Sequence, residues 1–256
     1  LYPIMDTTEA RYAEISRLMA ASGDWIVPQF QSGVPFWGKP PLFAWLSAGS
    51  FKLLGLNEFA ARLPHFVLGL ATLWLVYHGT QQCTSLKRQL LAVLILVSTP
   101  LFFVSSGAVM TESGLLFSTT LAMTGFWLGT RQQPGGHQRS GWGLLFFAAL
   151  GLGMLAKGPI AMVLVGLPVF AWTLSGRHWS RLRSLPWLPG LLVMTLIALP
   201  WYLQMERQSP GFIQYFIVGE HFLRFIQPGW RGDLYGNAHA EFPGMIWLLW
   251  FQATAA

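Results

Sequence analysis

Two isolated charges stand inside otherwise apolar sequence. Glu112 lies in AVMTESGLL and Lys157 in GMLAKGPIA, and each is the only charge within some twenty residues. Placing an ionisable group among apolar spans costs free energy, so such a group is first interpreted as functional. A turn that needs only polarity could use Ser, Asn or Gly instead. The sequence therefore predicts chemistry at both positions, by a carboxylate that accepts a proton or by an ammonium that binds an anion.

A second candidate is the acidic stretch MDTTEARYAEISRLMAASGDW at residues 5–25, which holds four of the ten carboxylates. Its spacing predicts an amphipathic helix over residues 8–21, lying along a membrane surface. We expect its apolar side to be Ala10, Tyr12, Ile15, Leu18 and Met19, with Glu9, Ser16 and Arg17 turned away. Asp6 and Glu9, at the helix entrance, are candidates for chemistry, whereas Glu14 and Asp24 are expected to be solvated or to cap. The alternative is a solvated helix whose charges only pair with one another.

Lys39 is followed by two prolines in VPFWGKPPL, residues 34–42. The prolines restrict the backbone and remove N–H donors. An ammonium held there could bind a phosphate as a point charge. The alternative is a lysine at a helix end whose charge reaches into water past an apolar stem.

Residues 219–244 mix charges with aromatic rings, an arrangement that suits a sugar, because rings stack on its apolar faces and charged groups bond its hydroxyls. The charged or titratable members are Glu220, His221, Arg224, Arg231, Asp233 and His239, and the aromatic members include Phe222, Phe225, Trp230 and Tyr235. A metal could use Glu220, His221 and His239, but this spacing matches no standard ligand pattern. We therefore expect no cofactor, with a divalent metal as the open alternative.

Composition decides the class of protein that must position these residues. The chain is 53% hydrophobic and 10% charged, whereas about 25% charged residues is usual in soluble domains. It is expected to be an integral membrane protein. The net charge of +6 is dispersed among apolar runs, so it does not indicate a nucleic-acid partner. Cys83 is the single cysteine, which excludes an internal disulfide.

Apolar runs predict six complete membrane spans, since a span needs about 20 apolar residues. They cover residues 61–79, 89–108, 113–130, 141–156, 159–175 and 186–203, and a further one begins near Pro243. Residues 40–55 contain Lys52 and predict a half-buried or interfacial helix. The chain begins at Leu1 without a signal peptide and stops inside the run PGMIWLLWF. We therefore expect a fragment that lacks an N-terminal span and a C-terminal portion.

The charges sort to opposite sides of these spans. One set of loops holds Lys87, Arg88, Arg131, Arg139, Arg177, Arg181 and Arg183 and no acid, so it is predicted to be cytoplasmic. All ten acids fall on the other side. The resulting organisation is a single all-α polytopic domain over residues 1–256. It comprises an outer loop with surface helices (1–60), six spans (61–203), a second outer loop (204–242) and the start of another helix (243–256).

Five segments, in this order, resemble a known family. DTTEARYAEISRLMAASGDWIVP, PFWGKPPLFAWL, AVMTESGLLF, GMLAKGP and GEHFLRF are similar to bacterial membrane glycosyltransferases of the dolichyl-phosphate-mannose protein mannosyltransferase superfamily. The resemblance is greatest to the branch that transfers 4-amino-4-deoxy-L-arabinose to lipid A, and it covers nearly the whole chain. It implies a GT-C fold, a bundle of transmembrane helices with a periplasmic active site under an amphipathic first loop.

The resemblance also implies roles for individual residues. The acid of the first loop would be Asp6 or Glu9, the acid between two spans Glu112, and the phosphate-binding cations Lys39, Lys157 and Arg224. An inverting transfer needs a base for the acceptor proton, and fixed cations stabilise a phosphate leaving group. Asp6 is the first choice for the base and Glu9 the second. Further contacts to the substrate are expected from Arg11, Tyr12, Trp37, Glu220, His221 and Tyr235.

The implied partners are a polyprenyl-phosphate-linked sugar, membrane lipids, and a lipid, glycan or protein acceptor, in the bacterial inner membrane. Within the enzyme class, a protein O-mannosyltransferase or another lipid-linked glycosyltransferase is the alternative. A transporter or flippase of lipid-linked sugars is a different class, in which Glu112 and Lys157 would line a pathway. A transporter would be expected to carry charged residues at the depth of both leaflets, whereas the acidic residues here all fall on one side of the membrane. A non-catalytic scaffold would leave these two charges without a purpose.

Overall fold

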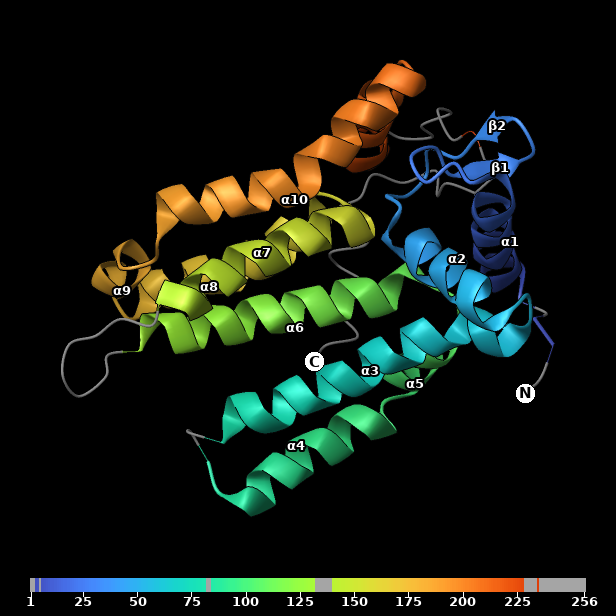
Figure 1. The fold of residues 1–256 in the computed structure, drawn as a ribbon. Helices are drawn as coiled ribbons and strands as arrows, with labels where there is room; N and C mark the ends of the chain where they lie inside the picture. Colours follow the sequence, from blue (N-terminus) through green and yellow to red (C-terminus); the bar gives the residue numbers. More distant parts are fainter. Residues whose placement is uncertain (1–2, 5, 82–83, 132–139, 228–233, 235–256) are drawn as a thin grey trace.

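A computed structural model of the protein describes residues 3–4, 6–81, 84–131, 140–227 and 234, and these form a helical bundle (Figure 1). The helices are α1 (Thr7–Ser22), α2 (Leu42–Leu54), α3 (Glu58–Thr80), α4 (Leu86–Ser98), α5 (Pro100–Gly107), α6 (Thr111–Thr130), α7 (Ser140–Lys157), α8 (Ile160–Ser175), α9 (Trp179–Arg183), α10 (Trp187–Gln208), the π-helix η1 (Gln214–Leu223) and α11 (Arg224–Ile226). The predicted all-α architecture is confirmed. One short antiparallel hairpin, β1 (Gln29–Gln31) with β2 (Val34–Pro35), pairs Gln29 with Pro35 and was not predicted.

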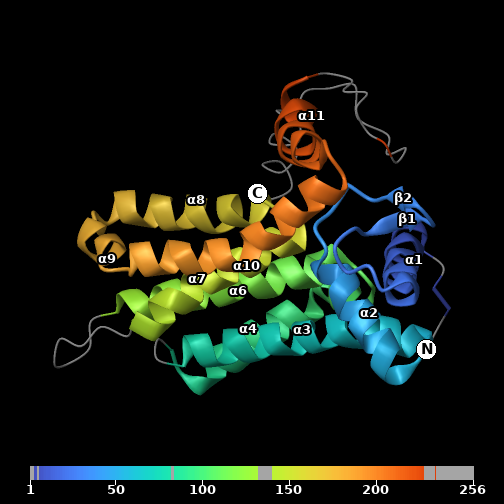
Figure 2. The same cartoon turned by 45° about the horizontal axis from the view of Figure 1, so that its top comes forward.

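The long helices run side by side, and α1 crosses their common direction at one end (Figures 1 and 2). Within the bundle, α6 packs between α3 and α7, while α7 also contacts α10 and α8. Small residues permit the closest of these approaches. A Cβ added to Gly125 would lie 2.9 Å from the Phe146 amide nitrogen, and one added to Gly129 would lie 2.9 Å from that of Gly143. Such glycine contacts are typical of helices that pack within membranes.

Two helices, α3 and α10, are long and apolar enough to cross a membrane, and α4 and α5 together form a third, bent candidate. The span predicted over residues 89–108 is formed by two helices, α4 and α5, that meet at 69°. Thr99 is extended there, with φ −73° and ψ 119°, as a residue before proline prefers. α2, α7 and α8 are shorter apolar helices. Six spans therefore remain a prediction, and the span expected from Pro243 lies outside the described residues.

Every acidic residue that the structure describes lies at the end of the bundle near α1, where α3 and α6 begin and α10 ends. The opposite end carries Lys87, Arg88, Arg131, Arg177, Arg181 and Arg183. The predicted sorting of charge is thus confirmed for this part of the chain. Which end faces the cytoplasm stays a prediction.

Helix α1 covers the predicted range, but the set of residues on its buried side differs from the prediction. Tyr12, Ile15 and Met19 are buried as expected, and so are Glu9 and Ser16. Ser16 satisfies its hydroxyl within the helix by donating to the Tyr12 carbonyl at 2.7 Å. Hydrophobic spacing missed this burial because a polar side chain can be buried when its hydrogen bonds are made.

Candidate active site

The two isolated charges of the sequence meet in space. Lys157 ends α7 and Glu112 lies in the first turn of α6, and Lys157 Nζ donates to Glu112 Oε1 at 2.7 Å. Thr111 Oγ1 donates to the other carboxylate oxygen at 3.2 Å. The side chains of Lys157 and Glu112 are 27% and 38% exposed. This ion pair is therefore accessible to a substrate and not sealed in the core.

A second carboxylate and cation pair comes from η1 and α11. Arg224 Nη1 donates to Glu220 Oε2 at 3.0 Å, and the Tyr215 hydroxyl donates to Glu220 Oε1 at 3.3 Å. The Glu220 side chain is only 7% exposed, whereas that of Arg224 is 37% exposed. The guanidinium of Arg224 is therefore accessible, whereas the Glu220 carboxylate that it bonds is buried.

A tight turn after α10 directs η1 back toward the loop that holds Lys39. Glu206 accepts hydrogen bonds from the amides of Gly211 at 2.9 Å and Ile213 at 2.7 Å. Gly211 has φ +97°, which favours glycine. Trp37 Nε1 donates to Ser209 Oγ at 2.8 Å, and its ring lies 5.7 Å from that of Tyr215. Trp37 thus joins the first loop to η1.

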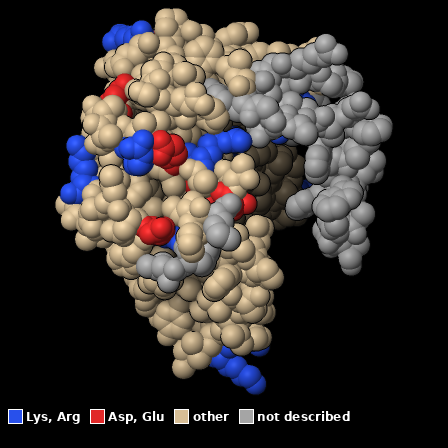
Figure 3. All heavy atoms as spheres, turned by 90° about the vertical axis from the view of Figure 1, so that its right-hand side faces the viewer, with Lys and Arg blue, Asp and Glu red and all other residues tan. Residues whose placement is uncertain are grey.

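The charges of both ion pairs act on Lys39. Burial lowers its pKa, the Glu220 and Glu112 carboxylates raise it, and the positive charges of Lys157 and Arg224 lower it further. Among the described residues no carboxylate forms an ion pair with Lys39. The cluster of Lys39, Glu112, Lys157, Glu220 and Arg224 therefore has three cations and two carboxylates, an excess of positive charge that suits an anion. Figure 3 shows acidic and basic side chains gathered on this end of the molecule.

Two neighbouring side chains stay neutral near pH 7. Burial chiefly, and then the Glu112 charge, raise the pKa of Tyr12 to about 12, so its hydroxyl keeps its proton. Burial lowers the pKa of His221, although the hydrogen bond of its Nδ1 to the Phe216 carbonyl, at 2.7 Å, acts in the opposite direction. His221 near neutral pH does not add a cation for phosphate.

Glu9, predicted to be a base, is instead enclosed. Its carboxylate receives Arg62 Nε at 2.7 Å, Arg62 Nη2 at 2.8 Å and the Val109 amide at 3.1 Å, and the residue is 2% exposed. A general base must reach the proton that it removes. The geometry therefore does not support the catalytic assignment of Glu9. The residue instead ties α1 and α3 to the segment just before α6.

His65 forms a second buried connection to the start of α6. Its Nε2 lies 3.0 Å from Ser47 Oγ and its Nδ1 lies 2.7 Å from Ser113 Oγ. Ser47 Oγ also bonds to the Ala61 carbonyl at 2.8 Å, and Ser113 Oγ to the Met110 carbonyl at 3.2 Å. Ser113 follows Glu112 directly, while the Glu9 bond holds Val109. Glu112 is thus positioned from both sides by buried hydrogen bonds.

Asp6 caps α1. Its Oδ2 accepts from the amides of Thr8 at 2.9 Å and Glu9 at 3.0 Å, and the residue is exposed. Arg11 lies over the Phe30 ring at 5.8 Å. Glu14 pairs with Arg17 at 2.7 Å, and Asp24 Oδ1 accepts from the Ile26 amide at 2.9 Å, as expected of solvated or capping carboxylates. The role of Asp6 as a base remains a prediction.

The two roles of Asp6 predict different outcomes for two substitutions. If Asp6 only caps, Asp6→Asn keeps activity, because Asn is an equally good cap, whereas Asp6→Ala loses about 1 kcal/mol of stability. We expect this result, measured as sugar transfer and melting temperature of the protein in detergent. Loss of transfer in Asp6→Asn, with an unchanged melting temperature, would restore Asp6 as the base.

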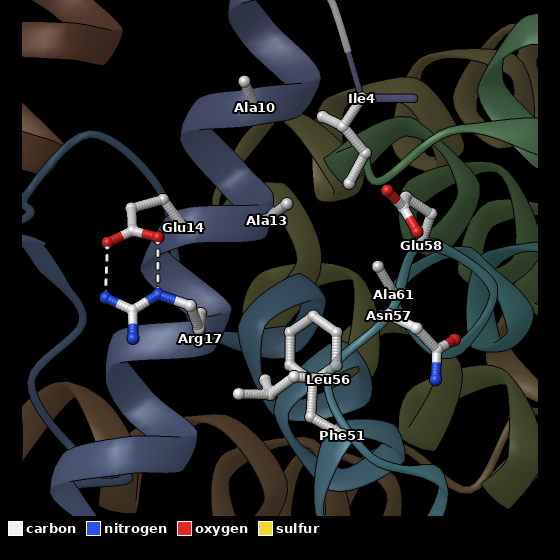
Figure 4. A pocket seen from close by; sticks show the side chains of 10 residues that line it. All are labelled: Ile4, Ala10, Ala13, Glu14, Arg17, Phe51, Leu56, Asn57, Glu58 and Ala61. Atoms are coloured by element: carbon white, nitrogen blue, oxygen red, sulfur yellow. Dashed lines mark hydrogen bonds and ion pairs between the residues drawn. The ribbon is translucent and has the colours of Figure 1, made fainter. Parts of the chain in front are cut away.

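A separate hollow lies where α1 faces the end of α2 and the start of α3 (Figure 4). Its volume is about 350 Å³, and it is lined by Ile4, Ala10, Ala13, Glu14, Arg17, Phe51, Leu56, Asn57, Glu58 and Ala61. None of the three cations of the cluster lines it. It is therefore distinct from the candidate active site.

The predicted site residues are largely brought together. Lys157 pairs with Glu112 and Arg224 pairs with Glu220, and the charges of all four act on Lys39. Trp37 contacts the ring of Tyr215, whose hydroxyl bonds Glu220, while the Glu112 charge acts on Tyr12 and the Lys39 charge acts on His221. Tyr235 and His239 lie outside the described residues. Within the described part of the chain, no three His, Cys, Asp or Glu side chains form a metal-binding group.

Sequence reasoning missed Arg62, His65, Glu206 and Tyr215. Arg62 and His65 carry a usable signal, because both are polar residues inside the predicted span 61–79. Glu206 and Tyr215 carry none, because their roles depend on a turn and a π-helix.

Comparison with known proteins places this arrangement in context. Residues 3–216 match the family "Dolichyl-phosphate-mannose-protein mannosyltransferase". Two relatives named undecaprenyl phosphate-alpha-4-amino-4-deoxy-L-arabinose arabinosyl transferase, from Edwardsiella ictaluri and Erwinia tasmaniensis, are 35% and 34% identical over 86% of this chain. The chain spans 39% of the length of each.

A crystal structure of ArnT from Cupriavidus metallidurans, bound to undecaprenyl phosphate, superposes with a TM-score of 0.80 at 29% identity. The match covers 86% of this chain and 40% of that protein. The expected GT-C membrane fold is confirmed by this similarity. By its sequence and by its fold, the chain belongs to the dolichyl-phosphate-mannose-protein mannosyltransferase family.

Proposed function

We propose that this chain forms the donor-phosphate site of a glycosyltransferase that takes a sugar from a polyprenyl phosphate. The observation that carries the proposal is the convergence of Lys39, Lys157 and Arg224 around two carboxylates at one end of the bundle. The membership of a transferase family and the transferase names of the relatives favour this function over transport of the lipid-linked sugar.

The proposed reaction exchanges one bond to the anomeric carbon for another. An acceptor oxygen attacks that carbon as the bond to the lipid phosphate oxygen breaks, with inversion. The acceptor proton passes to a carboxylate, and the bonding electron pair leaves with the phosphate. Cations that are already positioned stabilise the growing negative charge without reorganisation. Of the carboxylates, Glu112 is the accessible one beside Lys157, so we assign the base to Glu112 in preference to Asp6 or Glu9.

The donor that we propose is an undecaprenyl-phosphate sugar, and an amino-pentose is the first candidate. The names of the relatives and the undecaprenyl phosphate bound to the ArnT of Cupriavidus metallidurans support it. Lipid A is the first acceptor to test, followed by a glycan or a protein. An acceptor that is itself a phosphate would need no strong base, and Glu112 would then orient Lys157.

The proposal is tested with membranes that contain the protein and with labelled undecaprenyl-phosphate sugars. Appearance of the sugar on lipid A, glycan or protein, with release of undecaprenyl phosphate, supports it. Movement of the intact donor across the bilayer, without cleavage of its sugar–phosphate bond, would show a transporter instead.

We further propose that the cluster faces the periplasm of the bacterial inner membrane, as the basic opposite end suggests. In a Cys83→Ser background, a membrane-impermeant maleimide should label Gln208→Cys in intact spheroplasts. It should label Ser180→Cys only after permeabilisation. Both positions are exposed. The reverse pattern would invert the orientation.

Donor binding should weaken at alkaline pH. The pKa of Lys39 lies below the usual lysine value of about 10.4, because of burial and of the Lys157 and Arg224 charges. Phosphate binds the protonated form, so affinity falls as pH rises through that pKa. The check is undecaprenyl phosphate affinity against pH for the unaltered protein and for Lys39→Arg. Because the guanidinium of Lys39→Arg stays charged at alkaline pH, the affinity of this variant for undecaprenyl phosphate should not decrease as the pH rises. An equal fall in both proteins would assign the titration to another group.

A further inference from the structure

The segment that joins α8 to α10 forms an exposed basic surface at the end of the bundle opposite the cluster. Arg177, His178, Arg181 and Arg183, together with Trp172, Trp179 and Trp187, are termed the basic rim. The sequence from residue 113 to residue 205 contains no Asp or Glu. Among the described residues, no carboxylate pairs with any of the three arginines. No carboxylate in the described part of the chain therefore compensates the positive charge of the rim.

The rim is organised around an indole. The His178 ring lies 4.2 Å from the Trp172 ring, and the Arg181 guanidinium lies 5.9 Å from it. A guanidinium over an aromatic face is held by electrostatic attraction. Gly176 makes room for this arrangement, since a Cβ there would overlap the His178 ring. His178 and Arg181 are thus held against the Trp172 ring.

Arg177 occupies a conformation that an arginine rarely adopts. Its φ is +51°, and it is the one non-glycine residue with positive φ among those described. The His178 amide bonds to the Thr173 carbonyl at 3.0 Å, which closes the end of α8. Glycine is the usual residue at such a helix terminus, because it has no Cβ penalty. An arginine kept under strain indicates that its side chain has a function.

The rim also lies where a membrane surface would be. It connects the end of α8 to the start of α10, and Leu174 and Leu188 beside it are 51% and 84% exposed. Trp179 and Trp187 are 41% and 42% exposed. Half-exposed tryptophans beside exposed leucines are typical of the boundary between lipid tails and head groups. Arginines at that depth meet lipid phosphates.

We propose that the basic rim is a binding site for the head groups of anionic phospholipids. The phosphate accepts hydrogen bonds from Arg177, Arg181 and Arg183, while Trp179 and Trp187 lie at head-group level beside the acyl chains. This site anchors the end of the bundle that does not carry the transferase cluster. It is independent of which membrane face the cluster occupies.

The experiment measures lipids that stay bound to the purified protein, by native mass spectrometry, after exchange against equal phosphatidylglycerol and phosphatidylcholine. Phosphatidylglycerol should be retained preferentially, and less so as NaCl rises from about 0.05 to about 0.5 M. A basic residue near a lipid surface contributes about a fivefold gain in affinity. The Arg177→Gln, Arg181→Gln, Arg183→Gln variant should therefore lose at least about tenfold in phosphatidylglycerol affinity.

A matched control removes charge elsewhere at the same end. Lys87→Gln with Arg88→Gln, at the exposed start of α4, should change the affinity far less. If the triple variant does not accumulate, Arg177→Gly tests the site by itself. It should melt at a higher temperature in neutral detergent, because strain is relieved, yet retain less phosphatidylglycerol.

Three results of the lipid experiment would overturn the proposal. They are equal retention of both lipids, an equal effect of the control variant, and full retention in Arg177→Gly. Inorganic phosphate, added without lipid, should not raise the melting temperature. A rise that the triple variant abolishes would assign the rim to a free phosphate and not to a membrane lipid. Sugar transfer is not measured in any arm, so the outcome does not depend on the proposed enzymatic function.

Discussion

Glu112→Gln is expected to lower kcat/KM for sugar transfer by about 10²- to 10⁴-fold, the usual contribution of a positioned general base. The substitution keeps the size of the side chain and its ability to accept a hydrogen bond from Lys157. It removes the charge and the capacity to take the acceptor proton. Glu112 Oε1 lies 2.7 Å from Lys157 Nζ and the side chain is partly exposed, so this carboxylate is accessible from outside the core.

The matched control is Glu14→Gln. Glu14 is also partly exposed and ion-paired, with Arg17 at 2.7 Å, but it lines the separate hollow between α1, α2 and α3. This control should transfer sugar at the unaltered rate. Undecaprenyl phosphate affinity is measured in parallel. If Glu112→Gln loses donor binding and keeps the rate at saturating donor, Glu112 only orients Lys157, and the base lies elsewhere.

Arg62→Met is expected to destabilise the protein by about 3–5 kcal/mol, because it leaves the Glu9 carboxylate buried without its partner. Glu9 and Arg62 are 2% and 5% exposed and are joined by two hydrogen bonds, at 2.7 and 2.8 Å. The melting temperature in detergent should fall by roughly 10 °C. Sugar transfer should fall as well, since Glu9 also accepts from the Val109 amide ahead of Glu112.

Two comparisons isolate the cause. Arg17→Met breaks the exposed pair with Glu14 and should cost no more than about 1 kcal/mol. Adding Glu9→Leu to Arg62→Met removes the stranded charge and should recover much of the lost stability, although the Val109 amide stays unpaired. If Arg62→Met melts like Arg17→Met, the buried pair does not stabilise the fold. If the double variant regains stability but not activity, the pair positions Glu112.

Part of this site could be predicted from local sequence. Glu112 and Lys157 were recognisable because each interrupts a long apolar run, where an ionisable group is costly. Lys39 was recognisable from the proline pair that follows it. The two roles that sequence could not separate were those of Asp6 and Glu9. Both stand at the entrance of the predicted amphipathic helix, and only the structure shows that the distant Arg62 encloses Glu9.

The sequence alone determined the membrane class, the positions of most helices and the sorting of charge to two ends, because hydropathy and charge are properties of neighbouring residues. It did not determine the 69° break between α4 and α5, the π-helix η1, or the pairing of Glu9 with Arg62. Only the tertiary structure decided these. A polar group becomes buried or accessible according to which distant segment supplies its hydrogen bonds, and no local pattern specifies that partner.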